Sequence, residues 1–504
     1  MGEPLILALD QGTTSTRAIL FDGAGRALSQ AARPLAQSYP RDGWVEHDAR
    51  AIFADSVAVL REALATAGRE AREIAALGIT NQRETTVVWG KATGEPIHPA
   101  IVWQDRRTAE ACDRLRAEGL EPKIVEDTGL LLDAYFCGPK IAWILDAVEG
   151  ARGRAARGEL LAGTIDAWLV WKLTGGAVHA TDATNASRTL LMDLEAQRWR
   201  EDLCEIFAVP ERVLPEIRDT AGSFGETLPG LLGAPVRICG AAGDQQAALM
   251  GHGCIRAGGV KATYGTGCFM LLHTGEAAPR SSARLLTTVA ARVQGKATYA
   301  LEGSIFIAGA AIQWMGEGLG VAGGPRAVEA LAQRARPAHG VVAVPAFTGL
   351  GAPYWDAEAR GAIFGLTRDA GLPEIAEALF DACAYQTRDL IEAMRADAPQ
   401  ALGPGAVLHI DGGMASSEWF ARRLADLTGL STAPAADPET TALGAALFAG
   451  IGAGVFGSLE IAAGTPKSTG MLKSRLDDEA RAEGYARWRD AVSRTLSALG
   501  GASR

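Results

Sequence analysis

Apolar and polar positions repeat with two different periods along this chain. Residues 5–9 and 18–21 are short apolar runs bounded by turn residues, which predicts two buried strands of a β-hairpin. Residues 48–67 have apolar side chains at helical spacing, and Asp48 is placed to cap that helix. A strand over 74–80 follows. Strands and helices then alternate, and this alternation is typical of an α/β fold.

The same patterns predict the elements that follow. Strands are expected over 85–89, 100–102 and 235–240, and helices over 106–117, 139–147, 160–173 and 199–208. The strand ending at 240 runs into a helix that ends around Gly251. Residues 260–272 are two apolar strands around a Gly/Thr turn, a degenerate copy of the opening hairpin. A strand over 407–411 leads into two glycines and a helix, and residues 477–499 predict a covering helix.

The repeated hairpin suggests a duplicated fold that clamps a nucleotide between two halves. A chain of 504 residues is also too long for one hydrophobic core. We expect two domains, residues 1–252 and 253–504.

Composition and charge narrow the class of partner. Apolar residues make up 48% of the chain and charged residues 21%, as in an ordinary globular protein. The formal net charge of −10 argues against a nucleic acid or an anionic membrane as partner, because both need a positive field. Small molecules are the expected partners.

Cysteines and the N-terminus bear on the compartment. The seven cysteines are scattered, without a Cys-x-x-Cys pair, which argues against zinc and against a disulfide framework. Residues 2–4 lead directly into a strand, and no apolar run reaches the roughly 18 residues of a membrane span. We expect no membrane insertion and a cytoplasmic location.

The turn of the first hairpin, residues 10–17, carries the first candidate chemistry. Gly12 allows close backbone approach to a ligand. The hydroxyls of Thr13, Thr14 and Ser15, with Arg17, suit phosphate oxygens, while Asp10 suits Mg²⁺. The alternative is an ordinary polar hairpin tip. No G-x-x-x-x-G-K-[ST] motif is present, so this hairpin is the candidate phosphate-binding device.

Arg83 and Glu84 follow the strand over 74–80. Ligands of open α/β sheets bind at such carboxyl ends, and a donor beside an acceptor matches neighbouring hydroxyls of a polyol. The alternative is a solvated turn between two strands.

Asp244 follows another strand. It is placed either as a helix N-cap or as a carboxylate that takes a proton from an attacking hydroxyl, and the two roles are compatible. Residues 318–323 satisfy G-x-G-x-x-G but follow a helical pattern, so we do not expect a dinucleotide site there.

Taken together, these segments resemble the FGGY family of carbohydrate kinases. The resemblance covers nearly the whole chain, in the family's order, over residues 9–17, 80–85, 103–106, 135–136, 140, 163–166, 181–191, 242–248, 263–271, 349–367 and 411–413. It implies an α/β fold of two actin-like, ribonuclease-H-like ATPase domains with a nucleotide cleft between them. Arg83 and Glu84 with Trp103 and Phe269 resemble the family's glycerol-specific set, as distinct from its pentulose and gluconate kinases.

The resemblance implies ATP-dependent phosphorylation of glycerol to sn-glycerol 3-phosphate, in glycerol catabolism. Asp244 would be the general base, and Asp10 and Asp244 would hold Mg²⁺. The implied glycerol-binding residues are Arg83, Glu84, Trp103, Tyr135, Asp244, Gln245 and Phe269. The implied ATP-binding residues are Thr13, Thr14, Ser15, Arg17, Thr266, Gly309, Gln313, Gly413 and Ser417.

Three positions depart from the family. Ser417 stands where an asparagine commonly lies near the adenine, so that contact is expected to be weaker or to be made by another group. Residues 229–235 match a loop that binds fructose 1,6-bisphosphate in some bacterial members but hold no basic residue, and the histidine phosphorylated in other members aligns near Gly222. Neither mode of regulation is expected.

Two alternatives stay open at this point. One is a non-catalytic, chaperone-type member of the same ATPase fold, which would need a peptide-binding domain or a long interaction tail. The other is a sibling kinase acting on another polyol or a ketose. By resemblance the protein is expected to form a homodimer or homotetramer.

Overall fold

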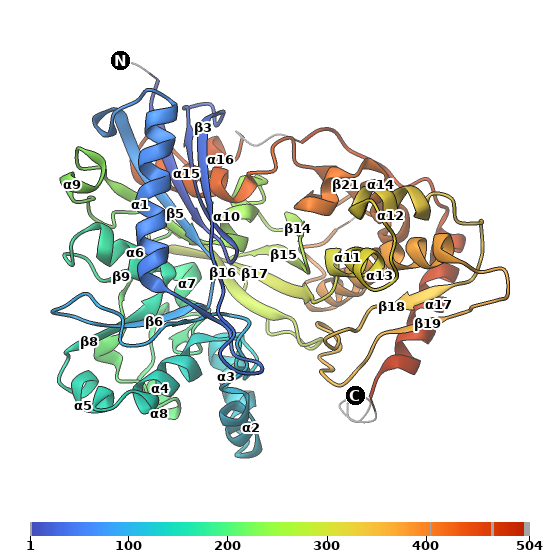
Figure 1. Ribbon diagram of the computed structural model, residues 1–504, viewed down its shortest axis with the longest axis horizontal. Coiled ribbons are helices and arrows are strands. Elements are labelled where there is room, and N and C mark those ends of the chain that lie inside the picture. Colours follow the sequence, from blue (N-terminus) through green and yellow to red (C-terminus); the bar gives the residue numbers. More distant parts are fainter. Residues whose placement is uncertain (1–2, 404, 465–467, 498–504) are drawn as a thin grey trace.

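The computed structural model describes residues 3–403, 405–464 and 468–497. Two lobes lie side by side, and each is built around a central β-sheet (Figure 1). The first sheet has the spatial order β13 (Ile238–Gly243), β5 (Ile74–Asn81), β1 (Leu5–Gln11), β2 (Ser15–Phe21) and β3 (Ala27–Pro34). The second has the order β16 (Leu286–Val293), β17 (Lys296–Ile305), β15 (Cys268–Gly275), β14 (Val260–Tyr264), β20 (Val407–Asp411) and β21 (Ser431–Pro434).

The two sheets repeat one topology. In each, the opening strand pairs antiparallel with the strand after it in the chain and parallel with a later strand, β1 with β2 and β5, β14 with β15 and β20. A further parallel strand, β13 or β21, completes that side. The predicted α/β fold and its duplicated hairpin are therefore confirmed.

Smaller strands complete the first lobe and the outer part of the second. A four-stranded sheet has the order β4 (Glu46–His47), β7 (Ala100–Ile101), β6 (Thr86–Gly90) and β8 (Leu160–Thr164). Two-stranded pairs are β9 (Ala180–Asp182) with β12 (Glu216–Arg218), β10 (Met192–Asp193) with β11 (Arg198–Trp199), and β18 (Val342–Val344) with β19 (Ala362–Phe364).

Helices cover the sheets. In the first lobe they are α1 (Ala49–Thr66), α2 (Ala109–Ala117), α3 (Glu121–Thr128), α4 (Cys137–Ala147), α5 (Ala151–Ala156), α6 (Ile165–Leu173), α7 (Ala183–Ala186), α8 (Glu201–Ile206), α9 (Pro229–Leu232) and α10 (Asp244–Gly251). The helices later in the chain are α11 (Gly309–Glu317), α12 (Gly324–Ala332), α13 (Leu372–Asp397), α14 (Glu418–Thr428), α15 (Thr440–Gly452), α16 (Leu459–Ala463) and α17 (Asp478–Thr495). Among the described residues, no helix is both long and apolar enough to cross a bilayer.

One predicted helix, over 160–173, is wrong over its first five residues. Residues 160–164 form strand β8, which pairs antiparallel with β6, and only residues 165–173 are helical. The run is apolar on every side, so its periodicity does not separate a buried strand from a buried helix. The strand at 238 also extends three residues beyond the prediction, to Gly243.

Other predictions hold with small shifts at the ends. The helix at 48–67 is present, and the Asp48 side chain accepts from the backbone of Arg50. The predicted helix at 477–499 is present from Asp478 to Thr495, and its expected last residues lie outside the described part of the chain. The G-x-G-x-x-G segment connects α11 to α12 and follows no strand, as predicted.

The two faces of the first sheet are covered by helices from different parts of the chain. Leu5, Leu7 and Leu9 pack on one face with the buried side of α1. Ile6 and Ala8 point to the opposite face, because successive strand residues alternate, and there they meet α15. Figure 1 shows this helix, late in the sequence, lying against the blue N-terminal strands.

Glycines allow α15 to approach the backbones of β5, β13 and α10 closely. A Cβ on Gly444 would overlap the backbone carbonyl of Ala247 in α10, and one on Gly78 in β5 would overlap that of Ala445. A Cβ on Gly240 in β13 would lie 2.7 Å from the backbone nitrogen of Ala449. Helix α15 therefore packs backbone against backbone on β5, β13 and α10.

We predict that Gly444→Ala destabilises the protein by roughly 1–3 kcal/mol, since the added methyl group must push α10 and α15 apart. Thermal unfolding measures the change. The matched control is Gly153→Ala, in helix α5, where an added Cβ meets only the flexible end of Arg157 at 3.3 Å. A Gly444→Ala melting temperature no lower than that of the control would contradict this account of the contact between α15 and α10.

Candidate active site

Three parallel strands of the first sheet end at one edge. The register pairs Asp10 with Thr80 and Thr80 with Ala242, so β1, β5 and β13 finish together. The turn of the first hairpin, Arg83 with Glu84, and Asp244 follow these ends directly. Sequence-predicted residues from three separate segments are thereby brought to one edge of the sheet, where open α/β folds bind ligands.

Arg83 and Glu84 are buried, with exposed fractions of 3% and 1%. The solvated-turn alternative is therefore wrong. Glu84 also has a left-handed backbone, at φ 58°, which is unusual for a residue with a side chain. The buried Lys140 ammonium holds this turn, because its Nζ donates to the backbone carbonyls of Glu84 (3.1 Å) and Tyr135 (2.7 Å).

Three aromatic rings form a wall beside this turn. The Trp103 ring meets the Tyr135 ring at 5.8 Å and the Phe269 ring at 6.0 Å, both edge to face. Phe269 comes from β15 of the second sheet, so both lobes contribute to the wall. Trp103 Nε1 also donates to Thr13 Oγ1 at 2.9 Å. A hydroxyl that accepts in this way keeps its own hydrogen for a further acceptor.

Asp244 is the first residue of α10, and the N-cap is Gly243. The capping role considered for Asp244 is therefore wrong. Its Oδ1 accepts from the backbone nitrogen of Gln245 at 2.7 Å and lies 3.4 Å from Nε of Arg83. The side chain keeps an exposed fraction of 30%. Burial raises the pKa of Asp244, while the charges of Arg83 and Lys261 oppose the rise. Such a carboxylate is reachable and more basic than an ordinary one.

Lys261 is a functional candidate that the sequence reasoning missed. It lies fully buried on β14, and its Nζ donates to the side-chain oxygen of Gln245 and to Thr263 Oγ1 at 3.0 Å. Burial lowers the pKa of Lys261, against the charges of Asp411 and Asp244. A lysine inside the apolar run 260–264 was the available signal.

The turn of the first hairpin is closed by a hydrogen bond from the Gly12 nitrogen to the Ser15 carbonyl at 2.9 Å. Thr13 and Ser15 are half-buried and Thr14 is exposed. Arg17 forms an ion pair with Glu439, the residue before α15. The hairpin is thus tied to a segment of the second half of the sequence.

Asp10 lies in a region of negative charge. Burial, opposed by Arg17, raises the pKa of Asp10 to about 7, and the nearby carboxylates of Asp244 and Glu439 add to the rise. A divalent cation would relieve this repulsion. One or two carboxylates are also what Mg²⁺ takes from a protein when substrate phosphates and water supply its other ligands.

Two turns and a helix N-terminus meet in the second lobe. The carbonyl of Thr266 accepts from the nitrogens of Ala308 and Ala310 at 2.9 and 3.0 Å. A Cβ on Gly309 would lie 2.5 Å from the Gly265 carbonyl and 3.8 Å from Met414 Sδ. The structure thus brings together Thr266, Gly309 and the segment containing Gly413, and exposed Gln313 follows one helical turn after Gly309.

Ser417 has a structural task. Its Oγ accepts from the Phe420 backbone nitrogen at 3.0 Å and caps helix α14. The adenine contact predicted for Ser417 stays a prediction.

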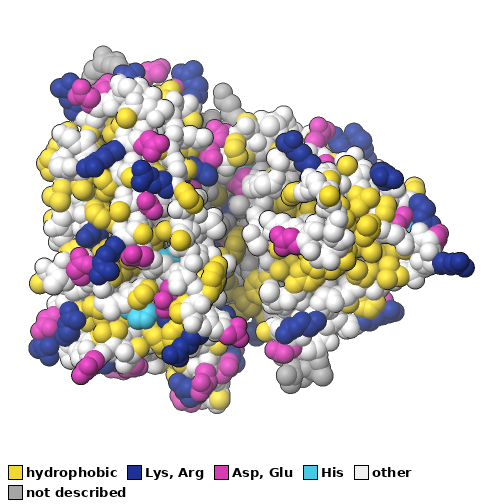
Figure 2. Space-filling model, viewed as in Figure 1, with side chains coloured by type: hydrophobic (Ala, Val, Ile, Leu, Met, Phe, Trp, Pro, Cys, Tyr) yellow, Lys and Arg dark blue, Asp and Glu magenta, His cyan; other side chains and the backbone are white. Residues whose placement is uncertain are grey.

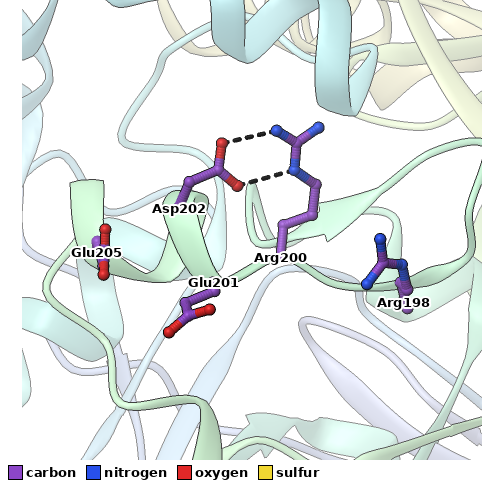
Figure 3. Close-up of a pocket in the computed structure, with 5 residues that line it drawn as sticks. All are labelled: Arg198, Arg200, Glu201, Asp202 and Glu205. Carbon is purple, nitrogen blue, oxygen red and sulfur yellow. Dashed lines mark hydrogen bonds and ion pairs between the residues drawn. The ribbon is translucent and has the colours of Figure 1, made fainter.

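The surface is hollowed between the two lobes, as Figure 2 shows. A separate polar pocket is lined by Arg198, Arg200, Glu201, Asp202 and Glu205 (Figure 3). Arg200 is held there by both oxygens of Asp202, at 2.8 and 2.6 Å. None of the candidate site residues lines this pocket, and Arg200 already has carboxylate partners.

Comparison with known proteins agrees with this arrangement. Residues 5–251 match the N-terminal domain of the FGGY family of carbohydrate kinases, and residues 260–453 match its C-terminal domain. A glycerol kinase from Alcanivorax borkumensis is 53% identical over 500 residues, which are 99% of this chain and 100% of that protein. Glycerol kinase 1 from Pseudomonas aeruginosa is 51% identical over 98% of this chain and 99% of its own length.

Solved structures of carbohydrate kinases have the same fold. The crystal structure of Plasmodium falciparum glycerol kinase with ADP has a TM-score of 0.91 and 32% identity, covering 98% of this chain and 99% of that one. A gluconate kinase from Lactobacillus acidophilus has a TM-score of 0.88 at 20% identity over the full length of both chains, a likeness of fold alone. The predicted resemblance is confirmed, and the chaperone-type alternative is not supported. The chain belongs to the FGGY family of carbohydrate kinases.

Proposed function

We propose that this protein transfers the γ-phosphoryl group of ATP to a terminal hydroxyl of glycerol, giving sn-glycerol 3-phosphate and ADP, in glycerol catabolism. The observation that carries the proposal is the buried Arg83–Glu84 turn, which adjoins Asp244 and lies beside an aromatic wall that reaches the hairpin through Trp103 and Thr13. Relatives that match this chain over nearly its full length are named glycerol kinase, which supports the same substrate.

Each proposed glycerol contact has a chemical reason. Arg83 donates and Glu84 accepts, which matches two neighbouring hydroxyls. Tyr135 and Gln245 add polar contacts. The carbon side of glycerol lies against Trp103 and Phe269, whose rings exclude water from the reacting hydroxyl.

Asp244 is proposed as the general base. It takes the proton of the terminal hydroxyl while that oxygen forms a bond to the γ-phosphorus. The bond from phosphorus to the β,γ-bridging oxygen breaks, and its electron pair leaves with ADP. Phosphoryl transfer of this kind depends on placement and charge neutralisation more than on covalent chemistry by the protein.

The ATP phosphates are proposed to bind the first hairpin, through Thr13, Thr14, Ser15 and Arg17. The second lobe would complete the nucleotide site, with Thr266, Gly309, Gln313, Gly413 and Ser417. Asp10, partly through water, and Asp244 would hold Mg²⁺, which neutralises phosphate charge when bound.

The family resemblance also bears on the location and the assembly of the protein. We propose a cytoplasmic location, and a homodimer or homotetramer as the assembled state. Light scattering on the protein as it elutes from a size-exclusion column measures the mass of the assembly directly.

We predict that ADP release, measured with a coupled assay, is fastest with glycerol among glycerol, xylulose, ribulose and gluconate. The reason is that Arg83, Glu84 and the Trp103–Phe269 wall enclose a short polyol. Absence of glycerol turnover, or a higher kcat/KM with a pentulose, would remove the proposed specificity.

We predict that Asp244→Asn lowers kcat about 10²- to 10⁴-fold, since the variant cannot accept the proton. Glycerol binding, measured by calorimetry, should be retained, because an amide still offers a hydrogen-bonding oxygen. Asp219→Asn, at a carboxylate paired with Arg292 outside the site, is the control. A near-normal kcat in Asp244→Asn would show that another group is the base.

We predict that Arg17→Ala raises KM for ATP roughly 10- to 100-fold, as expected for the loss of a hydrogen bond to a charged group. KM for glycerol should stay within about twofold, since Arg17 belongs to the phosphate hairpin. Arg33→Ala, on the exposed strand β3, is the matched control. Equal increases in both KM values would instead point to a general disturbance of the hairpin.

A further inference from the structure

Four charged side chains form a closed network behind the Arg83–Glu84 turn. Arg83 binds both oxygens of Glu302, at 2.5 and 3.0 Å. Arg188 donates to Glu84 Oε1 at 2.6 Å and to Glu302 Oε1 at 3.0 Å. All four residues are 3% exposed or less. Two positive and two negative charges therefore balance out of contact with water.

Glu302 is the member of this network that lies on an inner strand of the second sheet. It lies on β17 between β15 and β16, and the register places it beside Leu271 and Leu286. A carboxylate in such apolar surroundings is costly unless it is paired. Burial would raise the pKa of Glu302, but the charges of Arg188 and Arg83 lower it to about 2, so it is ionised at neutral pH.

The network fixes which nitrogens of Arg83 and which carboxylate oxygen of Glu84 stay available to a ligand. Glu302 occupies the two terminal nitrogens of Arg83, while Nε lies 3.4 Å from Asp244. Arg188 binds Oε1 of Glu84, which leaves the second oxygen able to accept from a ligand hydroxyl. The Arg188 guanidinium also lies 5.6 Å from the Tyr135 ring centre.

We propose that Glu302 and Arg188 are positioning residues for polyol recognition, an inference that rests on the proposed phosphorylation of glycerol. Glu302 fixes the two terminal nitrogens of Arg83, so that Nε is the atom that lies near Asp244, and Arg188 sets the orientation of Glu84. Glu302 belongs to the second sheet, whereas its partners belong to the first lobe. The polyol contacts are thereby held in place by a strand of the other lobe.

Loss of the Glu302 charge would leave its two arginine partners without their shared carboxylate. Arg83 and Arg188 would become two buried cations with only Glu84 between them. The terminal nitrogens of Arg83, released by Glu302, would turn toward the Asp244 carboxylate, which already lies 3.4 Å from Nε. That movement removes the donor from the polyol and ties the Asp244 carboxylate to Arg83.

The test is a kinetic comparison of Glu302→Gln and Arg188→Lys with the unmodified protein. We expect KM for glycerol to rise more than tenfold and kcat to fall, while KM for ATP changes less than twofold. Glu302→Asp, which keeps the charge, should recover part of the loss. A second readout is the ratio of the inhibition constant of propane-1,2-diol to KM for glycerol. It should fall, because the variants lose the contact that distinguishes the extra hydroxyl.

A matched control separates positioning from simple stabilisation. Arg292 on β16 pairs with Asp219 of the first lobe at 2.7 Å and lies outside the site. Asp219→Asn should leave both KM values and the inhibition ratio unchanged, whatever its effect on the melting temperature. If Glu302→Gln behaves like this control, or if glycerol and propane-1,2-diol weaken equally, the inference is overturned. Absence of glycerol turnover by the unmodified protein would instead overturn the proposed function itself.

Discussion

The arrangement of the site depends on one close backbone approach, that of helix α15 to the first sheet. This helix follows the second sheet in sequence, yet it packs on β1, β5, β13 and α10 of the first lobe. Gly78, Gly240 and Gly444 permit the contact, because any side chain at these positions would meet backbone atoms. The helix begins beside Glu439 and Thr440, which contact Arg17 of the hairpin and Asp411 of the second sheet. Residues of the phosphate hairpin and of the second sheet thus meet at the same helix end.

Charge burial is the second constraint. Two residues next to Asp244 are held by charges of the second sheet. Arg83 forms an ion pair with Glu302, and the side chain of Gln245 accepts a hydrogen bond from Lys261. Both Glu302 and Lys261 lie on strands of the second sheet, while Arg83, Asp244 and Gln245 follow strands of the first. Each lobe therefore supplies charges that the other lobe needs. Removal of one partner from the packed structure would leave an ionised group unpaired in an apolar setting, which is strongly unfavourable.

Much of this could be predicted from local patterns. The two hairpins, the strand ends at Asp10 and Arg83, and the duplicated topology follow from apolar runs interrupted by turn residues. The strand at 160–164 could not be separated from a helix, since all its residues are buried and only their pairing with β6 identifies a strand. Glu302 and Arg188 were missed because their partners lie more than 100 residues away in sequence. The interruption of an apolar strand by Glu302 was a signal, but it names no partner. The predicted domain boundary at 252/253 stays a prediction, and so do the individual ligand contacts.

The position of α15 in the chain has a consequence for synthesis. The ribosome completes β13 at Gly243 but does not finish α15 until Gly452. At typical translation rates this interval lasts about 10–40 s. During that time Ile6, Ala8 and their neighbours on the same face of the first sheet lack the helix that covers them in the folded protein. The first lobe must therefore wait, with an apolar face exposed, for a segment made two hundred residues later. This face stays uncovered although every strand of the first sheet has already been translated.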